Sequence, residues 1–410
     1  MQINKKNIII LGSGFAAFSL LKRIKPKYYN ISVISPRNHF LFTPLLPSTT
    51  VGTIEFRSII EPIRNLKKIK YYQAYCTGID LPNKSVQCKH VNTENVFSVN
   101  YDILVIAAGE ITNTFNIDGV DEYAYLLKEV TDARKIRVRV IDCFENASIP
   151  GLSHDEKKKF LTFVVCGGGP TGVEFAAELH DFIEEDVKKK YMYLADLSEL
   201  ILIEAGRNIL NSFDEKLSSY TMKLFKRQNI NMKLNSNIVK VTMNHIYVND
   251  GSKLEYGLLV WATGNAAADL ILKTPFEKSK RAKILVDEYF KVKKFENIYA
   301  LGDCSEIENG PLPVTAQVAQ QQGIYLGRAF NRSAKRKILR PFKFHDLGML
   351  AYIGDQKALA DLPQYKGTGF KAFLFWRSVY ITRLVGLKNK ILVLFDWFKN
   401  VAFGRDVSNF

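Results

Sequence analysis

Residues 7–17 read Asn-Ile-Ile-Ile-Leu-Gly-Ser-Gly-Phe-Ala-Ala, an apolar run that leads into a glycine turn. Ile8–Leu11 predict a short strand buried in a parallel sheet, and Phe15–Ile24 predict the helix that follows it. Gly12 permits the tight turn, while Gly14 lets the backbone approach a pyrophosphate that the helix N-terminus would face. This G-x-G-x-x-A pattern therefore predicts a dinucleotide-binding βαβ unit.

Residues 161–174 repeat the design as Leu-Thr-Phe-Val-Val-Cys-Gly-Gly-Gly-Pro-Thr-Gly-Val-Glu. Their glycines complete the full G-x-G-x-x-G pattern, and Val173–Lys189 predict the helix. The next strand, Leu200–Ile203, ends at Glu204, the position that bonds an adenosine ribose 2′-hydroxyl. A carboxylate there repels a 2′-phosphate and favours NADH over NADPH, although nearby Arg207 would soften this preference. Two such turns in one chain predict a flavin and a nicotinamide, and therefore electron transfer.

The first glycine turn departs from the generic pattern at the end of its second strand, Ile31–Ile34. The acidic residue expected there is replaced by Ser35-Pro36-Arg37. A serine hydroxyl can still bond a ribose, and the arginine can face the adenine or a phosphate. Two further strands, Leu104–Gly109 and Asn297–Asp303, complete the domain, and the carboxylate of the second is expected on the flavin ribitol. Trp261–Gly264 predicts the exit strand of the nested second domain.

The bulk composition restricts the class of protein. At 410 residues, 47% of them hydrophobic, the chain is long enough for two or three folded domains. Its five cysteines show no CxxC and no zinc-like spacing, which disfavours disulfide and sulfide chemistry and predicts no metal site. No uncharged apolar run approaches the ~20 residues that span a bilayer. Because the first strand begins directly after residues 1–6, we expect either a mature N-terminal end or internal targeting. The net charge of +16 favours an anionic partner.

Basic and aromatic residues cluster in residues 370–403, where apolar residues recur at helical spacing on both sides of a break near Lys388-Asn-Lys390. The pattern predicts two basic amphipathic helices that lie in a headgroup layer without crossing it. The alternative is a helical pair packed on the protein's own core or on a second subunit. The apolar groups are Phe373, Trp376, Tyr380, Leu384 and Leu387, then Ile391, Leu394, Phe395, Phe398 and Ala402; the basic residues are Lys371, Arg377, Arg383, Lys388, Lys390, Lys399 and Arg405.

Four segments together resemble the type II (alternative, non-proton-pumping) NADH:quinone oxidoreductases, over nearly the whole chain and closer to their eukaryotic branch. The calcium-binding insertion of some plant and fungal members is absent. The matching segments are residues 35–47 after the second strand, Gly169–Glu174 at the second turn, Ala316–Gln321, which fits the A-Q-x-A-x-Q quinone-site pattern, and Leu347–Gly354.

The resemblance implies an enzyme that oxidises NADH and reduces a quinone through FAD. Gln317 and Gln321, one helical turn apart, would lie at the quinone end of the flavin ring, where a neutral amide can bond a quinone oxygen. The alternative is an amide that bonds backbone or solvent. Glu174 either complements the helix dipole or acts at the nicotinamide–flavin junction. Catalysis is expected from Glu174, Gln317 and Gln321.

Two larger sets of contacts follow from the resemblance. The residues expected to bind FAD are Gly12, Ser13, Gly14, Phe15, Ala16, Ser35, Pro36, Arg37, Thr43, Pro44, Ala108, Gly109, Gly302, Asp303, Ala316 and Gln317. The residues expected to bind NADH are Gly167, Gly168, Gly169, Pro170, Thr171, Gly172, Glu174, Glu204, Thr263 and Gly264.

The expected fold is α/β, with two Rossmann-like dinucleotide-binding domains and a C-terminal amphipathic, membrane-anchoring region. Residues 1–118 and 287–341 are assigned to the FAD domain, 119–286 to the NADH domain and 342–410 to the C-terminal region. Expected partners are a ubiquinone-type quinone, an anionic membrane surface contacted by residues 370–405, and a second copy of the chain, but no nucleic acid. The enzyme is expected as a peripheral protein of the mitochondrial inner membrane, with a bacterial cytoplasmic membrane as the alternative. Two alternatives stay open: a soluble NAD(P)H-dependent reductase of a protein acceptor, and an apoptosis-inducing-factor-like redox protein that binds nucleic acid.

Overall fold

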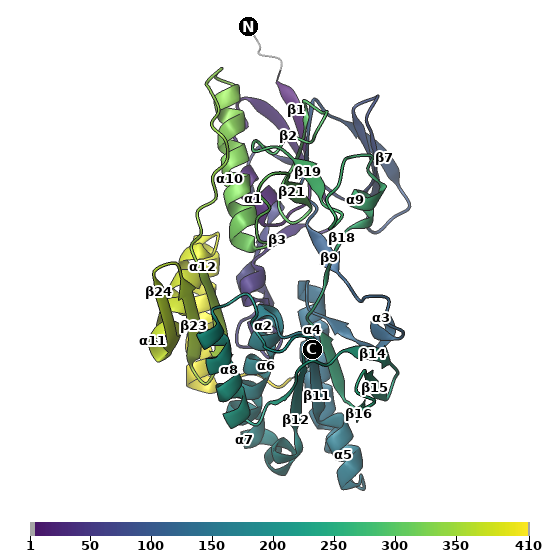
Figure 1. The fold of residues 1–410 in the computed structure, drawn as a ribbon, viewed down its shortest axis with the longest axis vertical. Coiled ribbons are helices and arrows are strands. Elements are labelled where there is room, and N and C mark those ends of the chain that lie inside the picture. Colours follow the sequence, from purple (N-terminus) through teal and green to yellow (C-terminus); the bar gives the residue numbers. More distant parts are fainter. Residues whose placement is uncertain (1–4, 409–410) are drawn as a thin grey trace. The chain divides into compact units, whose positions relative to one another are not determined.

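The chain folds into two compact units, and the computed structural model describes residues 5–408 (Figure 1). Unit 1 comprises Met1–Leu41, Ile60–Ile111 and Asn265–His345, and unit 2 comprises Phe42–Ile59, Thr112–Gly264 and Asp346–Phe410. This division differs from the expected domain boundaries. Residues 265–286 belong to unit 1, because their strand β19 (Ile284–Val286) pairs in parallel with β21 (Ser305–Ile307). Residues 42–59 belong to unit 2.

Unit 1 is an α/β unit whose largest sheet has seven strands. Its elements, besides β19 and β21, are β1 (Lys6–Leu11), α1 (Phe15–Leu21), β2 (Tyr29–Ser35), β3 (His39–Leu41), β4 (Ile60–Pro62), the 3-10 turn η3 (Ile63–Asn65), β5 (Lys70–Asp80), β6 (Ser85–His90), β7 (Val96–Asn100), β8 (Ile103–Ile106), β9 (Glu110–Thr112), β18 (Asn265–Ala267), α9 (Asp269–Lys273), β20 (Ile298–Ala300) and α10 (Ala316–Ser333).

The sheet order in unit 1 is β20-β8-β1-β2-β5-β6-β7. Strands β20, β8, β1, β2 and β5 are parallel, whereas β6 and β7 continue from β5 as an antiparallel meander. Ile8–Leu11 is almost fully buried, as expected for a parallel strand covered on both faces, while β7 alternates between exposed and half-buried residues. The four parallel strands predicted around the first glycine turn are therefore confirmed.

Helices α1 and α10 lie side by side in unit 1 (Figure 1). A Cβ atom at Gly323 would lie 2.1 Å from the carbonyl oxygen of Ala16, and one at Gly327 would lie 2.9 Å from that of Leu20. Any larger residue would separate the two helices, so these glycines fix their close backbone contact. Helix α10 begins after Thr315, whose Oγ1 accepts a hydrogen bond from the Val318 N–H.

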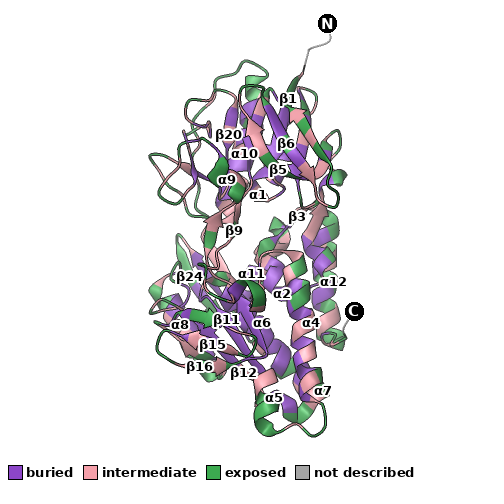
Figure 2. Ribbon diagram, turned by 90° about the vertical axis from the view of Figure 1, so that its right-hand side faces the viewer, coloured by how far each residue is buried: buried purple, intermediate pink, exposed green. Residues whose placement is uncertain are grey.

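Unit 2 contains a five-stranded parallel sheet in the order β10-β17-β11-β12-β13, and β11 and β12 lie in its buried interior (Figure 2). Its elements are the 3-10 turns η1 (Thr43–Leu45) and η2 (Phe56–Ile59), α2 (Leu46–Thr49), α3 (Val120–Tyr123), β10 (Tyr125–Leu126), α4 (Val130–Ala147), α5 (His154–Phe160), β11 (Thr162–Cys166), α6 (Pro170–Phe182), the π turn η4 (Ile183–Val187), α7 (Lys188–Tyr191), the 3-10 turn η5 (Met192–Leu197), β12 (Glu199–Ile203), α8 (Glu215–Arg227), β13 (Asn231–Lys233), β14 (Ile238–Val241), β15 (His245–Val248), β16 (Lys253–Glu255), β17 (Leu258–Trp261), β22 (Met349–Gly354), β23 (Lys357–Leu362), β24 (Tyr365–Gly369), α11 (Phe370–Arg383) and α12 (Leu387–Phe403).

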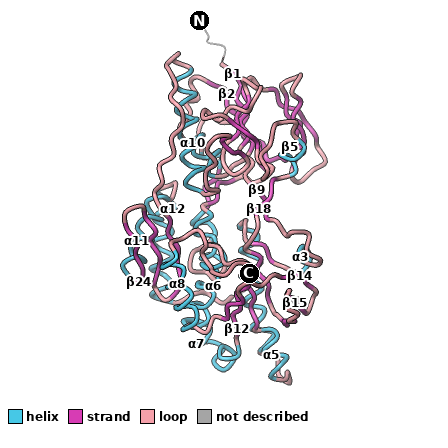
Figure 3. Tube along the Cα trace, viewed as in Figure 1, coloured by secondary structure: helices cyan, strands magenta, loops and turns pink. Residues whose placement is uncertain are grey.

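The C-terminal part of unit 2 holds more structure than the sequence predicted. Strands β22, β23 and β24 form an antiparallel sheet, and helix α11 lies against it (Figure 3). The two expected helices are present, but the break between them lies at Leu384–Gly386 and not near Lys388. Gly386 stands at the N-cap of α12, so Lys388 is already helical. Within residues 5–408, no helix combines the length and apolar composition needed to cross a membrane.

Candidate functional site

The first glycine turn has the strained backbone that only glycine tolerates. Gly12 adopts φ +112°, and a Cβ atom there would lie 2.2 Å from the carbonyl oxygen of Ala107. Gly14 is open by contrast, since the nearest atom to an added Cβ is an Arg37 nitrogen at 4.0 Å. The turn is therefore closed on its strand side and accessible on the side where a phosphate would approach.

The residues that replace the expected acid fold back onto this turn. The hydroxyl of Ser35 donates to the hydroxyl of Ser13 (3.0 Å), which donates to the carbonyl oxygen of Arg37 (3.1 Å). The Arg37 Nε donates to the carbonyl oxygen of His39 (3.1 Å), so the guanidinium is held beside the turn. Burial, with Arg37 nearby, lowers the pKa of His39 to about 4, so His39 is neutral at pH 7. The only charge that this segment offers to a ligand is the guanidinium.

The other predicted contacts of unit 1 gather at the same sheet edge. Because β1, β2, β8 and β20 are parallel, the residues that follow them meet at their carboxyl ends. Gly302 adopts φ +77°, and its N–H donates to the side-chain oxygen of buried Gln322 (2.6 Å). Gln322 is a positioning residue that the sequence did not identify, because only its neighbours carry the family motif. Thr43 and Pro44 form turn η1 in unit 2.

Beside Gly302 and Asp303 lies a small hollow lined partly by Lys283. The Lys283 ammonium is 3.0 Å from the carboxylate of Glu110, and both side chains are only 6% exposed. The two side chains hold each other in place, because separating them would leave each charge buried and unpaired. No sequence motif indicated this pair.

Gln317 and Gln321 both lie on helix α10, as predicted. The Gln321 amide is clamped to the backbone of His345: its Nε2 donates to the carbonyl oxygen (2.8 Å) and its Oε1 accepts from the N–H (3.0 Å). This geometry matches the alternative in which the amide bonds backbone. The contacts of both glutamines with a quinone stay predictions.

The second glycine turn repeats the geometry of the first in unit 2. Gly167 adopts φ +116°, and a Cβ atom at Gly172 would lie 2.0 Å from the Gly167 carbonyl oxygen, so helix and strand pack closely. A Cβ atom at Gly169 would meet nothing within 4 Å. The Glu204 carboxylate accepts hydrogen bonds from the N–H groups of Gly168 (2.6 Å) and Gly206 (2.7 Å). The structure thus places Glu204 beside the turn, at the carboxyl end of β12, where a ribose is expected.

Glu174 is not open to solvent at this turn but buried under the C-terminal sheet. Its carboxylate accepts a hydrogen bond from the Tyr352 N–H (3.1 Å), and burial raises its pKa to about 8. At pH 7 it is therefore mostly protonated, and a protonated carboxyl group complements the helix dipole poorly. Its role at the nicotinamide–flavin junction stays a prediction.

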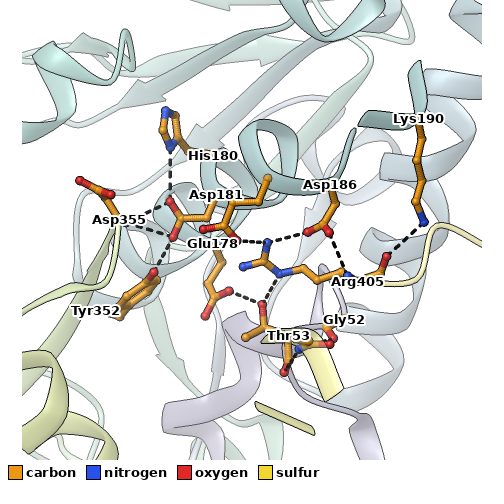
Figure 4. Close-up of polar contacts among 12 residues, drawn as sticks. Gly52, Thr53, Glu178, His180, Asp181, Asp186, Lys190, Tyr352, Asp355 and Arg405 are labelled. Carbon is orange, nitrogen blue, oxygen red and sulfur yellow. Dashed lines mark hydrogen bonds and ion pairs between the residues drawn. The ribbon is translucent and has the colours of Figure 1, made fainter. Parts of the chain in front are cut away.

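Three more acidic side chains of helix α6 and turn η4 are buried: Glu178, Asp181 and Asp186 (Figure 4). Glu178 accepts hydrogen bonds from the hydroxyls of Ser48 (2.7 Å) and Thr53 (2.6 Å), and burial raises its pKa. Asp181 accepts from the hydroxyl of Tyr352 and from the Asp355 N–H (3.0 Å).

The cation in this cluster is Arg405, from the C-terminal end of the chain. Its Nη1 lies 2.9 Å from Asp186 and 3.0 Å from Glu185, and its Nε donates to the hydroxyl of Thr53 (2.9 Å) (Figure 4). We refer to Glu178, Asp181, Glu185, Asp186 and Arg405 as the carboxylate cluster. The sequence predicted Arg405 as a basic residue of the tail, whereas the structure shows it only 7% exposed.

The two C-terminal helices differ in how they bear on the alternatives that the sequence left open. In α11, Phe373 and Trp376 are buried against unit 2 itself, so its predicted membrane face is core. Helix α12 buries Val393 and Trp397 together with two polar residues. Asp396 accepts hydrogen bonds from the Ser58 hydroxyl (2.6 Å) and the Glu55 N–H (3.0 Å), and Asn389 donates to the Ser58 carbonyl oxygen (3.0 Å). Its apolar stripe faces outward, with Leu387 75%, Ile391 57%, Leu394 49%, Phe395 58%, Phe398 66%, Val401 82% and Phe403 83% exposed.

Comparisons with known proteins agree on one family. The pyridine nucleotide-disulphide oxidoreductase model matches residues 6–323, and the NDH2 C-terminal domain model matches residues 346–406. A probable NADH dehydrogenase of Dictyostelium discoideum is 43% identical over 415 residues, which cover 100% of this chain and 92% of that protein. The mitochondrial external NADH-ubiquinone oxidoreductase 2 of Saccharomyces cerevisiae is 39% identical, over 99% of this chain and 83% of that protein.

Solved structures give the same result. NDH2 from Plasmodium falciparum in complex with NADH superposes with a TM-score of 0.94 at 34% identity, over 99% of this chain and 100% of that chain. The sulfide:quinone oxidoreductase of Aquifex aeolicus, at 18% identity and a TM-score of 0.72, shares the fold alone.

Proposed function

This chain belongs to the type II NADH:quinone oxidoreductases, and we propose that it oxidises NADH and reduces a ubiquinone-type quinone through bound FAD, without pumping protons. The observation that carries the proposal is the pairing of two glycine turns of different chemistry. The first is faced by the Arg37 guanidinium and the second by the Glu204 carboxylate. The relatives described above are NADH dehydrogenases and NADH-ubiquinone oxidoreductases, which favours this function over a protein-acceptor reductase or a nucleic-acid-binding protein.

FAD, when bound, supplies the two-electron carrier that links a hydride donor to a quinone acceptor. The residues of the first glycine turn fit this group. The open side of Gly14 and the N-terminus of α1 accept a pyrophosphate, and Arg37 adds a positive charge. Asp303, which follows β20, is the acceptor for ribitol hydroxyls.

Glu204 selects the nicotinamide cofactor. Its carboxylate is already held by two backbone N–H groups, so it presents a fixed negative charge to the adenosine ribose. A ribose 2′-hydroxyl can donate to it, whereas a 2′-phosphate would be repelled. This supports NADH as the hydride donor, with Gly167–Gly172 holding its pyrophosphate.

The quinone is assigned to the N-terminal turns of α10. Thr315 caps this helix by accepting from the Val318 N–H, and Gln317 lies in its first turn. Gln317 is assigned the direct bond to a quinone oxygen by its place in the A-Q-x-A-x-Q pattern, while the Gln321 amide bonds both backbone groups of His345. Gln321 then acts by holding the residues that follow α10.

The outward apolar stripe of α12 supports peripheral attachment to a membrane, and the mitochondrial relatives support the inner mitochondrial membrane as its location. Its exposed leucine and phenylalanine side chains would enter the acyl boundary, and Lys388 and Lys390 would face anionic headgroups. The same stripe can serve a homodimer, in which two copies cover one another.

Stopped-flow mixing of the holoenzyme with NADH, and then with a short-chain ubiquinone, tests the function. NADH should bleach the flavin absorbance and the quinone should restore it. In Gln317→Ala the second phase should slow about tenfold, the equivalent of one lost hydrogen bond, while the first phase is unchanged. Gln320→Ala, on the same helix, is the matched control.

The two parts of the assignment fail separately. If quinone does not restore the absorbance of the wild-type protein, the proposed reaction is wrong. If Gln317→Ala reoxidises as fast as Gln320→Ala, the reaction stands and the quinone site lies elsewhere.

A further inference from the structure

A second basic surface lies on unit 1, formed by two segments far apart in the sequence. The loop after α1 and the end of α10 are joined by the side chain of Asn331, whose Nδ2 donates to the carbonyl oxygen of Arg23 (2.8 Å) and whose Oδ1 accepts from the Lys25 N–H (2.9 Å). The Tyr29 hydroxyl adds a bond to the carbonyl oxygen of Phe330 (2.8 Å). These bonds fix the two segments side by side, as the adjacent helices α1 and α10 suggest in Figure 1.

This surface gathers positive charge without acidic residues from the same segments. The sequence has no Asp or Glu in residues 1–54, nor in residues 309–345. Three acidic groups of other unit 1 elements are engaged: Asp102 accepts from the Asn7 N–H, Asp287 accepts from the Lys291 N–H, and Glu296 pairs with the Lys291 ammonium. Glu288, whose carbonyl oxygen accepts from the Phe342 N–H (2.9 Å), is an exposed acidic residue beside the second segment. The exposed cations of the surface are Lys22, Arg23, Lys25, Lys27, Arg328, Arg332, Lys335, Arg336, Lys337, Arg340 and Lys343.

An apolar side chain stands in the middle of these cations. After α10 the chain closes a turn in which the Arg332 guanidinium donates to the carbonyl oxygen of Ile338 through Nε (3.0 Å) and Nη2 (2.7 Å). The Lys337 N–H donates to the Arg332 carbonyl oxygen (3.0 Å), and Arg336 adopts φ +55°. The turn is therefore held by hydrogen bonds, and it leaves Ile338 85% exposed.

Cations at the end of a helix can simply complement its dipole and remain solvated. That explanation accounts for Lys22 and Arg23 at the end of α1 and for Arg332 in the last turn of α10. It does not account for the cations that lie beyond these turns, which are Lys27, Lys337, Arg340 and Lys343. An exposed isoleucine with a basic rim matches the chemistry of a bilayer surface, where the aliphatic group enters the acyl boundary and the cations meet phosphates. A single-stranded nucleic acid would stack its bases on aromatic rings. The α1 loop has one such half-buried ring in Tyr28, 4.9 Å from the Lys27 ammonium, so RNA binding is an outcome of the test below.

We propose that this surface of unit 1 docks on an anionic phospholipid membrane, with Ile338 as the inserted group and the surrounding lysines and arginines as the headgroup contacts. The inference is separate from the assignment of α12, because it rests on residues of unit 1 alone. Its electrostatic part acts only near the lipid surface, since exposed charges are screened beyond about 8 Å at physiological salt.

Co-sedimentation of the full-length holoenzyme with vesicles tests the proposal. Vesicles of phosphatidylcholine alone are compared with vesicles that also contain phosphatidylglycerol. The triple variant Lys335→Gln, Lys337→Gln, Arg340→Gln should bind the anionic vesicles about 100-fold more weakly, at roughly fivefold per lost charge. It leaves Arg332 in place to close the turn, and its NADH oxidation with a water-soluble quinone should be unchanged.

Matched variants separate a specific surface from net charge. Lys67→Gln, Lys273→Gln, Lys280→Gln removes the same charge from exposed positions elsewhere in unit 1 and should bind as the wild type does. Ile338→Ser should weaken the binding that persists at high salt, because burial of its side chain is not screened.

Three outcomes would overturn the proposal. The first is equal binding by the two triple variants. The second is binding that ignores phosphatidylglycerol. The third is a wild-type protein that binds RNA but not vesicles, with loss in the same triple variant, which would assign the surface to nucleic acid. The double variant Phe395→Ser, Phe398→Ser, measured by itself, reports on the membrane attachment proposed for α12. Failure of that attachment can therefore be distinguished from failure of the unit 1 surface proposed here.

Discussion

Replacing Arg405 with methionine tests how the C-terminus is fastened to unit 2. Methionine keeps an unbranched stem of similar length but removes the charge and all five donors. The Arg405 side chain is 8% exposed; its guanidinium lies 2.9 Å from Asp186 and 3.0 Å from Glu185, and donates to Thr53. Without it, the carboxylate cluster keeps its buried acids and loses the guanidinium that pairs with them.

The magnitude follows from the burial of the pair. Removing one partner of a buried ion pair costs about 3–5 kcal/mol, because the other charge stays buried and unpaired. For a unit of this size, each kcal/mol shifts the melting temperature by about 2–4 °C, so the loss is on the order of 10 °C. Arg405→Lys keeps the charge but cannot reach both carboxylates as a planar fork. Its melting temperature should therefore lie between those of the wild type and Arg405→Met.

The loss should grow with pH. Burial raises the pKa of Glu178 and of Glu185, and Arg405 opposes that rise in both. In the methionine variant their folded-state pKa values climb further above the unfolded values. The folded protein then binds more protons than the unfolded chain, so stability is retained at low pH and falls as pH rises through the folded pKa values. The deficit should be smaller at pH 5.5 than at pH 8.

Thermal unfolding followed by tryptophan fluorescence at both pH values measures these effects. Lys188→Met is the control: it breaks an exposed pair with Glu184, at 2.6 Å but with side chains 40% and 44% exposed. Such a pair contributes about 0–1 kcal/mol, so its melting temperature should move by no more than about 4 °C. If Arg405→Met and Lys188→Met have the same melting temperature at pH 8, the guanidinium does not stabilise the buried acids of the cluster and the reasoning is refuted.

Three further predictions address the two turns and the buried acid. Glu174→Gln should match the wild type near pH 6 and be more stable above pH 8, because the wild-type carboxyl, with its pKa raised to about 8, loses stability as pH rises through that value; melting curves against pH that run parallel would contradict this. Gly12→Ala should abolish FAD retention, since its Cβ would lie 2.2 Å from the Ala107 carbonyl oxygen, whereas Gly310→Ala, with nothing within 4 Å, should keep the flavin absorbance of the purified protein. Glu204→Ser should raise kcat/KM for NADPH relative to NADH by about 10- to 100-fold in steady-state assays, and an unchanged ratio would remove Glu204 from the specificity role.

The parts of the fold that the sequence predicted correctly are those with a local signal. The apolar strands and glycine turns are specified within about a dozen residues, because backbone geometry at Gly12 and Gly167 admits no other residue type. The sheet β22–β24 was not predicted, because its strands mix apolar, small and charged residues. Neither the alternation typical of a strand nor the spacing typical of a helix stands out in them.

The carboxylate cluster was missed for a different reason. Glu178 and Asp181 lie on one face of α6, and acidic residues at such spacing usually mark a solvated face. What makes the face buried is remote in sequence: Arg405 bonds Asp186 from 219 residues away, and Tyr352 reaches Asp181 from 171 away. Hydropathy likewise revealed two faces of α12 but not which one turns inward, since that depends on Ser58 and Glu55.

Helix α12 packs on unit 2 through Asn389, Val393, Asp396 and Trp397, which leaves its apolar stripe exposed for the membrane attachment proposed above. Attachment to a bilayer then requires no refolding and no release of a covering segment. The fraction of the protein bound to membrane then depends on the lipid concentration, as in a simple partition equilibrium between membrane and water. Away from lipid, the same stripe makes self-association the competing state, and purification without an amphiphile should yield aggregates whose size falls when vesicles are added.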